Sequence, residues 1–377
     1  MPKNVVLCCD GTANEFAENN TNVVKLYSTL IHDPARQVAF YHPGLGTMEP
    51  AGALTTWARA TTKLLGKAIG YGLENDIRDA YVFLMQTYEP RDSVYLFGFS
   101  RGAYTARAVA CLLKLYGLIH KGNESLVPYA IRMMMGITRV DAKNQTDKAL
   151  ADQYFNLAGQ FRNIMSGDCK PHFVGLWDTV SSVGWIGKPL HLPYISNNPD
   201  VQVSRHAISI DERRAFFRTN LWQRPDADLL IDPDKAWGPQ DVKQVWFPGV
   251  HCDVGGGYPE AESGLSKHAL HWMIRHAEIN GLLVDQTKVD EVLGKRSGDH
   301  VRPDANAIAH ESLKGFGWNL AELIPKKHYV KPGQYAWRMN RWQSRFIPPE
   351  ALVHESAFAR KDYRSHFPPD AKMDKTP

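Results

Sequence analysis

Residues 92–107 read Asp-Ser-Val-Tyr-Leu-Phe-Gly-Phe-Ser-Arg-Gly-Ala-Tyr-Thr-Ala-Arg, and this stretch decides the fold. Its first half, Val94 to Phe97, is a short apolar run rich in aromatic and β-branched residues, which predicts a buried strand. Gly-Phe-Ser-Arg-Gly follows at 98–102, and an Ala- and Leu-rich helical run begins directly after it. A G-x-S-x-G between a strand and a helix is typical of a sharp turn that exposes a nucleophilic serine. The stretch therefore predicts that Ser100 is a nucleophile.

The two glycines of this turn have a steric purpose. A side chain at Gly98 or Gly102 is expected to collide with the neighbouring strand or helix, and Ser100 is expected in a strained backbone conformation. The alternative is a chance G-x-S-x-G in an ordinary loop. Because both flanks fit the motif, we favour the nucleophile.

Further strands with helical patterns between them lie on both sides of the serine strand. Alternation of strands and helices predicts a mostly parallel α/β sheet covered by helices, in which chemistry gathers at the carboxyl ends of the strands. The G-x-S-x-G turn makes an α/β-hydrolase-like fold the expectation. Thr21 or Asn20 is expected to cap the first helix and Ser266 a late one. Residues 242–247 form the last clear strand. The other predicted strands are Asn4–Cys9, Gln37–Tyr41, His172–Asp178 and Arg205–Ile210.

We expect one catalytic domain over residues 1–377, with insertions at about 120–170 and 179–203 and a basic, aromatic C-terminal segment at about 325–377. Within it, residues 325–349 hold six Lys or Arg and no acid, interleaved with Trp, Tyr and Phe. Such a composition suits anionic lipid headgroups. A solvated basic face over packed aromatics is the simpler interpretation, because the spacing shows no amphipathic helix. The candidate lipid contacts are Trp337, Arg341 and Trp342.

Composition excludes several classes of protein. The chain is 44% hydrophobic and 22% charged, as in a globular protein with a large core. No apolar run is long enough for a membrane span, and strand-like sequence from Asn4 leaves no room for a signal peptide, so we expect a protein that is cytoplasmic as made. A net charge of +4 is too mild to indicate nucleic acid. Five cysteines, two of them adjacent, do not form a disulfide pattern.

A nucleophilic serine needs a base, and the base needs an acid to orient it. Of the 15 histidines, His251 alone follows a predicted strand in a Gly-rich loop downstream of the serine, so it is the candidate base. The alternative is a metal ligand paired with Asp253, but His-x-Asp has too few ligands for a metal site. We expect neither a metal nor a cofactor.

Two acids can orient His251. Counting strands after the serine favours Asp211, which follows the second strand, whereas Asp178 follows the first. Asp211 has Arg213 or Arg214 close in sequence as an ion-pair partner. Asp178 has no adjacent charge, and its neighbours Trp177 and Val180 are expected to shield it from water. This comparison favours Asp178 and keeps Asp211 as the alternative.

An oxyanion hole requires two backbone N–H groups. The first belongs to the residue after the nucleophile, Arg101, and the second to the loop that follows the strand two before the serine strand. That loop is Asp10-Gly11-Thr12, so Gly11 and Thr12 are the candidates. Asp10 could instead bind a metal for phosphoryl transfer, an alternative that leaves Ser100 and His251 without a role.

Five ordered segments together resemble one family of α/β-hydrolases, the largely uncharacterised one that contains the phospholipase effectors of type VI secretion systems. The resemblance spans roughly residues 3–365 and implies a Ser-Asp-His esterase on Ser100, Asp178 and His251, with lipase or phospholipase activity. Cys252 departs from the pattern, where a small polar residue is expected, and the large membrane-anchoring modules of some effectors are not seen. The segments are 10–14, 98–107, 175–180, 206–214 and 247–258.

The sequence thus predicts a serine carboxylic-ester hydrolase that most plausibly acts on lipids through an acyl-enzyme. Its partners would be a lipid or other ester substrate and a membrane surface, and export would use a route that needs no signal peptide. The first rival is an esterase for small esters or for deacetylation of polysaccharides. The second is a non-catalytic scaffold that binds a partner or membrane through residues 325–349.

Overall fold

The computed structural model describes residues 2–11, 19–44, 62–137, 145–180, 184–185, 188–189, 192–214, 217, 219–223, 240–296, 298–313, 326–331 and 334–377. Only the backbone is described for residues 62–71, 145–148, 151, 184–185, 188–189, 326–331 and 334–338.

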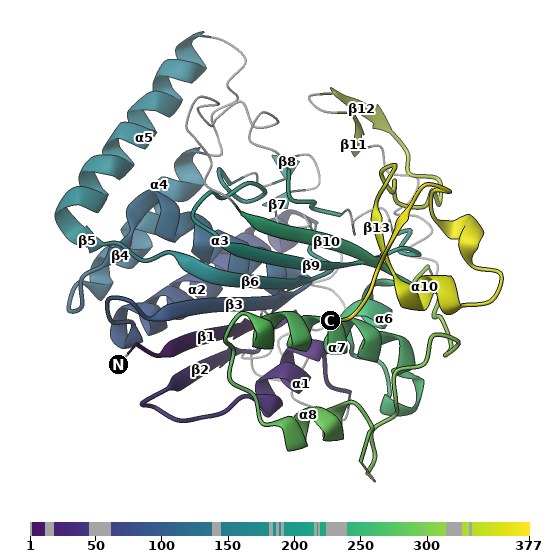
Figure 1. Ribbon diagram of the computed structural model, residues 1–377. Coiled ribbons are helices and arrows are strands. Elements are labelled where there is room, and N and C mark those ends of the chain that lie inside the picture. Colours follow the sequence, from purple (N-terminus) through teal and green to yellow (C-terminus); the bar gives the residue numbers. More distant parts are fainter. Residues whose placement is uncertain are drawn as a thin grey trace.

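An eight-stranded sheet in the order β14-β13-β10-β9-β6-β3-β1-β2 forms the centre of the described structure (Figure 1). Every neighbouring pair in it is parallel, which confirms the predicted mostly parallel sheet. All strand carboxyl ends therefore meet at one edge of the sheet. The strands are β1 Asn4–Cys9, β2 Gln37–His42, β3 Ser93–Phe99, β6 Pro171–Trp177, β9 Val203–Ser209, β10 Asp241–Phe247, β13 Leu352–His354 and β14 Lys372–Asp374.

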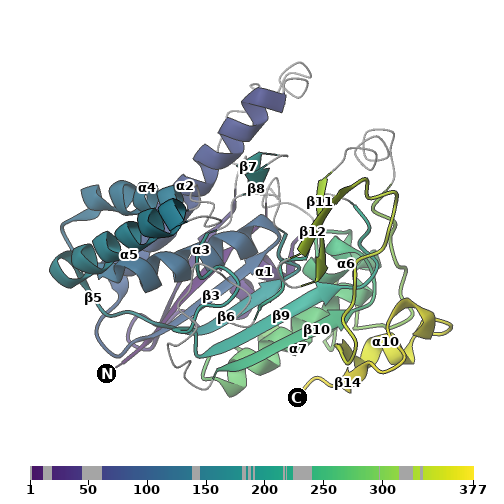
Figure 2. The ribbon, with the colours of Figure 1, turned by 90° about the horizontal axis from the view of Figure 1, so that it is seen from above.

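Alternate residues of each central strand enter two different cores. In β3, Val94 and Leu96 pack with one set of helices, whereas Tyr95 and Phe97 pack with another. Both faces of the sheet are covered, as a buried parallel sheet requires. Seen from above, the first set lies on one side of the sheet and α7 on the other (Figure 2). The first set is α2 Thr62–Thr87, α3 Arg101–Tyr116, α4 Val127–Ile137 and α5 Gln145–Met165; the second is α1 Asn22–Thr29, α7 Gly264–Ile279 and α8 Gln286–Val292.

Helix starts follow local capping chemistry. Thr21 caps α1 and its hydroxyl accepts from the N–H of Val24 at 3.3 Å, which confirms one of the two predicted caps. The predicted cap at Ser266 is wrong, because α7 starts at Gly264 after Ser263. Ser266 lies inside the helix, where its hydroxyl donates to the carbonyl of Ser263 at 2.9 Å.

The described part of the expected insertion at about 120–170 packs on the core. It contains helices α4 and α5, and Ile131 and Met134 of α4 pack in the same cluster as Tyr81 and Tyr116. The short strands β4 Leu118–Ile119 and β5 Ser166–Gly167 pair at the base of this part. Within the second expected insertion, the backbone forms a small hairpin of β7 Gly184–Trp185 and β8 Lys188–Pro189.

The C-terminal residues extend the sheet, so the prediction that residues 242–247 form the last strand is wrong. β13 pairs with β10, and β14 pairs with β13. Each strand has only three residues, too few to show an alternating pattern in the sequence. Helix α10, Glu355–Ala359, follows β13, and a third cluster around Trp246, Val353 and Phe367 packs beneath it. A hairpin of β11 Lys326–Lys331 and β12 Gln334–Arg338 precedes them.

Candidate active site

Ser100 occupies a sharp turn between β3 and α3. Its backbone has φ 58° and ψ −119°, a strained conformation for a residue other than glycine. A Cβ at Gly98 would lie 2.4 Å from the Gly102 carbonyl oxygen, and one at Gly102 would lie 2.2 Å from the Cys9 carbonyl oxygen. Both contacts are impossible, which confirms the steric reason for the two glycines. The turn is thus fixed by backbone packing against the carboxyl end of β1.

His251 and Asp178 meet at the same edge of the sheet, although they are far apart in sequence. Asp178 follows β6, and His251 is the first residue of the short helix α6, His251–Gly255, after β10. Asp178 Oδ2 lies 2.5 Å from His251 Nδ1, and both side chains are buried. Because a carboxylate only accepts hydrogen bonds, Nδ1 carries the proton and the other ring nitrogen is left with its lone pair.

Aromatic rings hold the imidazole of His251 beside the serine turn. The ring of Phe99, the residue before Ser100, lies 4.6 Å from the imidazole centroid. The ring of Phe217 meets the imidazole edge-on, at 4.8 Å. A side chain at Gly255 would collide with Phe99, so α6 can approach the turn only with glycine there. The imidazole of His251 therefore packs on the residue that precedes Ser100.

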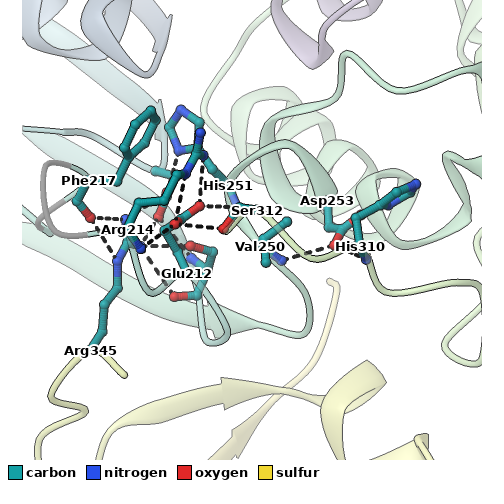
Figure 3. Close-up of polar contacts among 11 residues, drawn as sticks. Glu212, Arg214, Phe217, Val250, His251, Asp253, His310, Ser312 and Arg345 are labelled. Atoms are coloured by element: carbon teal, nitrogen blue, oxygen red, sulfur yellow. Dashed lines mark hydrogen bonds and ion pairs between the residues drawn. The ribbon is translucent and has the colours of Figure 1, made fainter. Parts of the chain in front are cut away.

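Glu212 is a buried carboxylate that the sequence analysis missed. Its Oε2 accepts from the backbone N–H of His251 at 3.3 Å, and its Oε1 accepts from the Ser312 hydroxyl at 2.9 Å. Arg214 neutralises it through two contacts of 3.0 and 2.9 Å and stacks on Phe217 at 3.5 Å (Figure 3). Glu212 thus joins the backbone of His251 to the Phe217 ring. Its signal in the sequence is the arginine two residues after it, within Asp211-Glu-Arg-Arg214.

Arg345 is the second residue that the sequence analysis missed. Its Nη1 lies 2.5 Å from Asp178 Oδ1 and its Nη2 lies 3.0 Å from Oδ2, so the guanidinium binds both oxygens. It reaches the site from the yellow C-terminal segment (Figure 3). Asp178 has no charged neighbour in the sequence, but the fold brings Arg345 to it. Arg345 is 167 residues away in sequence, so no local pattern could reveal the contact.

The two members of the pair are poised as a charged acid and a neutral base. Burial opposes ionisation of Asp178, but the charge of Arg345 and the hydrogen bonds from His251 and Arg345 outweigh it, and its pKa lies below the ordinary value. Burial also lowers the pKa of His251, and the bond from Asp178 only partly compensates. At neutral pH the imidazole is therefore free to take a proton.

Asp211 lies away from this pair. One of its oxygens accepts from the Gly249 N–H at 2.7 Å and from the Tyr363 hydroxyl, and the other contacts His366 at 2.9 Å. Neither Arg213 nor Arg214 forms the local ion pair that the sequence suggested, since Arg214 binds Glu212. Asp211 thus ties the loop before His251 to the C-terminal residues. A pocket of about 460 Å³ adjoins it, lined in part by Arg213, Ser312 and Tyr363.

The two candidate sources of an oxyanion hole differ. Arg101 is the first residue of α3, so its N–H has no acceptor within the helix. Gly11 lies near the turn, but its N–H donates to Asp10 Oδ1 at 2.6 Å. Thr12 lies outside the described residues. The other oxygen of Asp10 accepts from Thr21 and Tyr41, which gives that carboxylate a structural use at the end of β1.

Asp253, the acid of the His-x-Asp segment, contacts a different histidine. Its Oδ1 lies 2.6 Å from His310 Nδ1, and its Oδ2 accepts from the Val250 N–H at 2.9 Å. Among the described residues, no group of three or more His, Cys, Asp or Glu side chains is arranged to hold a metal ion. Burial raises the pKa of the intervening Cys252 to about 12, so it is a neutral thiol.

The candidate lipid contacts lie on one short segment. Arg341 and Trp342 occupy a turn and are both exposed, Trp342 by 43%. Trp337 belongs to β12, and its side chain is outside the described part of the chain. Phe346 is 67% exposed beside the inward-facing Arg345. In the part of the chain that the structure describes, no helix has both the length and the apolar character needed to span a bilayer.

One protein similar in sequence and two similar solved structures place this chain among known proteins. An uncharacterized protein of Saccharomyces cerevisiae is 36% identical over 225 residues, which are 57% of this chain and 32% of that protein. An uncharacterized protein from Pseudomonas aeruginosa, known from a crystal structure, is 20% identical with a TM-score of 0.41, covering 76% of this chain and 47% of its own. A Tle1 effector bound to the VgrG spike of the type VI secretion system is 18% identical with a TM-score of 0.34, covering 70% and 52%.

The chain spans about a third of the yeast protein and about half of each of the two solved structures. The sequence also matches a family model. Residues 3–276, from β1 through most of α7, match the model described as "T6SS, Phospholipase effector Tle1-like, catalytic domain". This match confirms the resemblance seen in the sequence: the chain belongs to the family of Tle1-like phospholipase effector catalytic domains of type VI secretion systems.

Proposed function

We propose that this protein is a serine carboxylic-ester hydrolase whose nucleophile, base and acid are Ser100, His251 and Asp178. The observation that carries the proposal is the buried contact of 2.5 Å between Asp178 and His251 beside the strained turn of Ser100. A carboxylate, an imidazole and a serine hydroxyl at one edge of a parallel sheet suit acyl transfer.

In the proposed reaction, the unprotonated ring nitrogen of His251 takes the proton of the Ser100 hydroxyl as its oxygen attacks the ester carbonyl. Asp178 stabilises the resulting imidazolium through Nδ1, and the Arg101 N–H binds the developing oxyanion. As the tetrahedral intermediate collapses, protonated His251 gives its proton to the departing alcohol, and Ser100 is left acylated. Water activated by His251 then releases the acid and restores the serine.

The substrate class we propose is a lipid ester, as in a phospholipase. Support comes from the family, whose model is named for phospholipase effectors, and from the exposed Trp342 and Phe346 beside the inward-facing Arg345. Arg341 in the same turn adds a cation for an anionic headgroup. Export through a type VI secretion system is part of this proposal.

Fluorophosphonate labelling tests the serine mechanism. The wild-type protein is expected to label on Ser100 and the Ser100→Ala variant to lose the label with its fold intact. A non-catalytic scaffold would give no label in either protein. Equal labelling of both would contradict Ser100 as the nucleophile.

A second experiment separates lipids from small esters. We expect hydrolysis of phospholipid in anionic vesicles and sedimentation with them, weaker at high salt, with Trp342→Ala or Arg341→Ala reducing binding several-fold. A series of p-nitrophenyl esters of rising chain length serves as the soluble reference. Activity on short esters without vesicle binding would favour the small-ester or deacetylating rival.

A further inference from the structure

Arg345 lies outside the residues that the family match covers, yet it contacts the acid of the proposed site. Its side chain is 7% exposed and that of Asp178 is fully buried. An arginine is expensive to bury, so its contacts here require an explanation beyond chance.

The contacts of Arg345 fix the carboxylate in one orientation. Asp178 Oδ1 accepts from Arg345 Nη1 at 2.5 Å and from the Ser209 N–H at 2.9 Å. Oδ2 accepts from His251 at 2.5 Å and from Arg345 Nη2 at 3.0 Å. Rotation of the carboxylate would break the bond to His251 together with at least one other. Each oxygen is thus held by two donors.

Further contacts fix the guanidinium itself. Nη1 donates to the Ser209 hydroxyl at 2.7 Å, and Nη2 and Nε donate to the Phe217 carbonyl at 2.6 and 3.1 Å. Phe217 in turn packs against His251. The planar fork of arginine can satisfy all of these acceptors at once, whereas a lysine ammonium cannot.

The charge of Arg345 acts on the base only through Asp178, since the cation that faces His251 itself is Arg214. Asp178 would alone stabilise a protonated His251, but its charge is balanced by the guanidinium bound to it. The other charged or titratable groups that act on the pair are Glu212 and Arg214 beside His251, and His206 with its neighbour Arg107 beside Asp178. Glu212 and Arg214 are paired with each other, so Arg345 is the cation that acts on Asp178 directly.

We propose that Arg345 is a positioning residue of the acid in the pair: it holds both oxygens of Asp178 for His251 and balances the carboxylate charge that would otherwise favour a protonated base. This inference rests on the proposed function of the Ser100 site. It makes the C-terminal segment beyond the family match a functional part of the active site.

The test compares Arg345→Gln, which removes the charge, with Arg345→Lys, which keeps it but loses the fork. On a soluble p-nitrophenyl ester, Arg345→Gln is expected to move the acid limb of kcat/KM upward by about one pH unit. It should also lower the plateau kcat by about 10- to 100-fold through lost orientation. Arg345→Lys is expected to lower kcat and leave the limb near its wild-type position.

Arg213→Gln is the matched control, because it removes an exposed arginine from the loop that carries Glu212. Solvent screens that charge, so neither the limb nor kcat should change. An unmoved limb in Arg345→Gln would overturn the electrostatic part of the inference. If Arg345→Gln does not fold, Arg345→Lys decides: wild-type kcat in that variant would overturn the positioning role.

A readout without turnover separates this inference from the proposed function. The pKa of the His251 imidazole can be followed by ¹⁵N NMR, with the resonance assigned from His251→Gln. Failure of the wild type to hydrolyse any ester would count against the proposed function alone. An upward shift of about one unit in Arg345→Gln supports the role of Arg345 in either case, and an unchanged pKa contradicts it.

Discussion

Two aspartate–histidine pairs meet at the short helix α6, Asp178–His251 and Asp253–His310. Their contacts are almost equally short, at 2.5 and 2.6 Å. They differ in what the second ring nitrogen meets. His310 Nε2 lies 2.9 Å from Glu262, so a second carboxylate holds the ring, and Tyr258 stacks on it at 3.6 Å. The ring of His251, by contrast, contacts a single carboxylate of the described residues, through Nδ1, and that carboxylate also binds Arg345.

The difference shifts the pKa values of the two histidines in opposite directions. Burial lowers the pKa of His310, but Glu262 and Asp253 outweigh it, so the pKa lies above the ordinary value and the ring favours the charged form. For His251 burial prevails and the neutral form is favoured. An aspartate beside a histidine is therefore not sufficient for a base. The desolvation of the ring and the charge around its acid decide whether the pair takes up protons or holds loops together.

The largest expected effect tests which pair is catalytic. Ser100→Ala and His251→Ala should each lower kcat by about 10⁶-fold, and the double variant should be no worse, because serine and base act as a unit. His310→Gln should keep kcat within about threefold, since it contacts no reacting group. Steady-state kinetics on a soluble ester measures all four proteins. A double variant showing the product of the two single losses would contradict the unit.

Next in size is the exchange of the acids. Asp178→Asn should keep the fold and lower kcat by about 10⁴-fold, because the amide favours the wrong histidine tautomer. Asp253→Asn and Asp211→Asn should mainly lower the free energy of unfolding, by about 1–3 kcal/mol each, through lost buried hydrogen bonds. Kinetics together with urea unfolding separates the two outcomes. The reverse pattern for Asp178 and Asp211 would overturn the choice of acid.

The pH profile of the wild type gives a smaller but direct measure. Because burial lowers the pKa of His251, the acid limb of kcat/KM should lie below about 6.5, the ordinary value for histidine. The profile is measured on an uncharged soluble ester. A limb above that value would mean that the charge of Asp178 prevails over burial.

The free energy of unfolding should fall as the pH rises, through the titration of His310. A pKa raised in the folded state adds stability that is fully present below about pH 6.5 and is lost as the pH rises through the raised value. The free energy of unfolding of the wild type should therefore exceed that of His310→Gln by about 1 kcal/mol near pH 5 and by less near pH 9. Urea unfolding at three pH values measures this. A difference that grows with pH would contradict an ion pair of protonated His310 with Asp253 and Glu262.

The smallest effect concerns Glu262, the exposed partner of His310. Glu262 is 45% exposed, so Glu262→Gln should lower the free energy of unfolding by only about 0.5 kcal/mol and leave kcat unchanged. Raising the salt concentration should reduce even this difference. A loss of several kcal/mol would show that this contact is as dependent on charge as the buried pair.

Much of the fold could be predicted from the sequence. The six long strands have strong local patterns, and all appear within two residues of the predicted bounds. β13 and β14 were missed because three residues carry no periodicity, and their pairing with β10 depends on how the C-terminal residues return to the sheet. The basic segment was interpreted by composition alone, which cannot tell the inward-facing Arg345 from the exposed Arg341.

The sequence by itself determined the serine turn, because Gly98, Ser100 and Gly102 lie within five residues and their steric roles are local. It also placed Asp178 and His251 at strand ends that a parallel sheet must bring to one edge. The tertiary structure alone decided which carboxylate each histidine meets and that a distant arginine binds the acid of the pair. Those contacts join residues 57 to 167 positions apart, and only the packing of separate elements sets their distances and their desolvation.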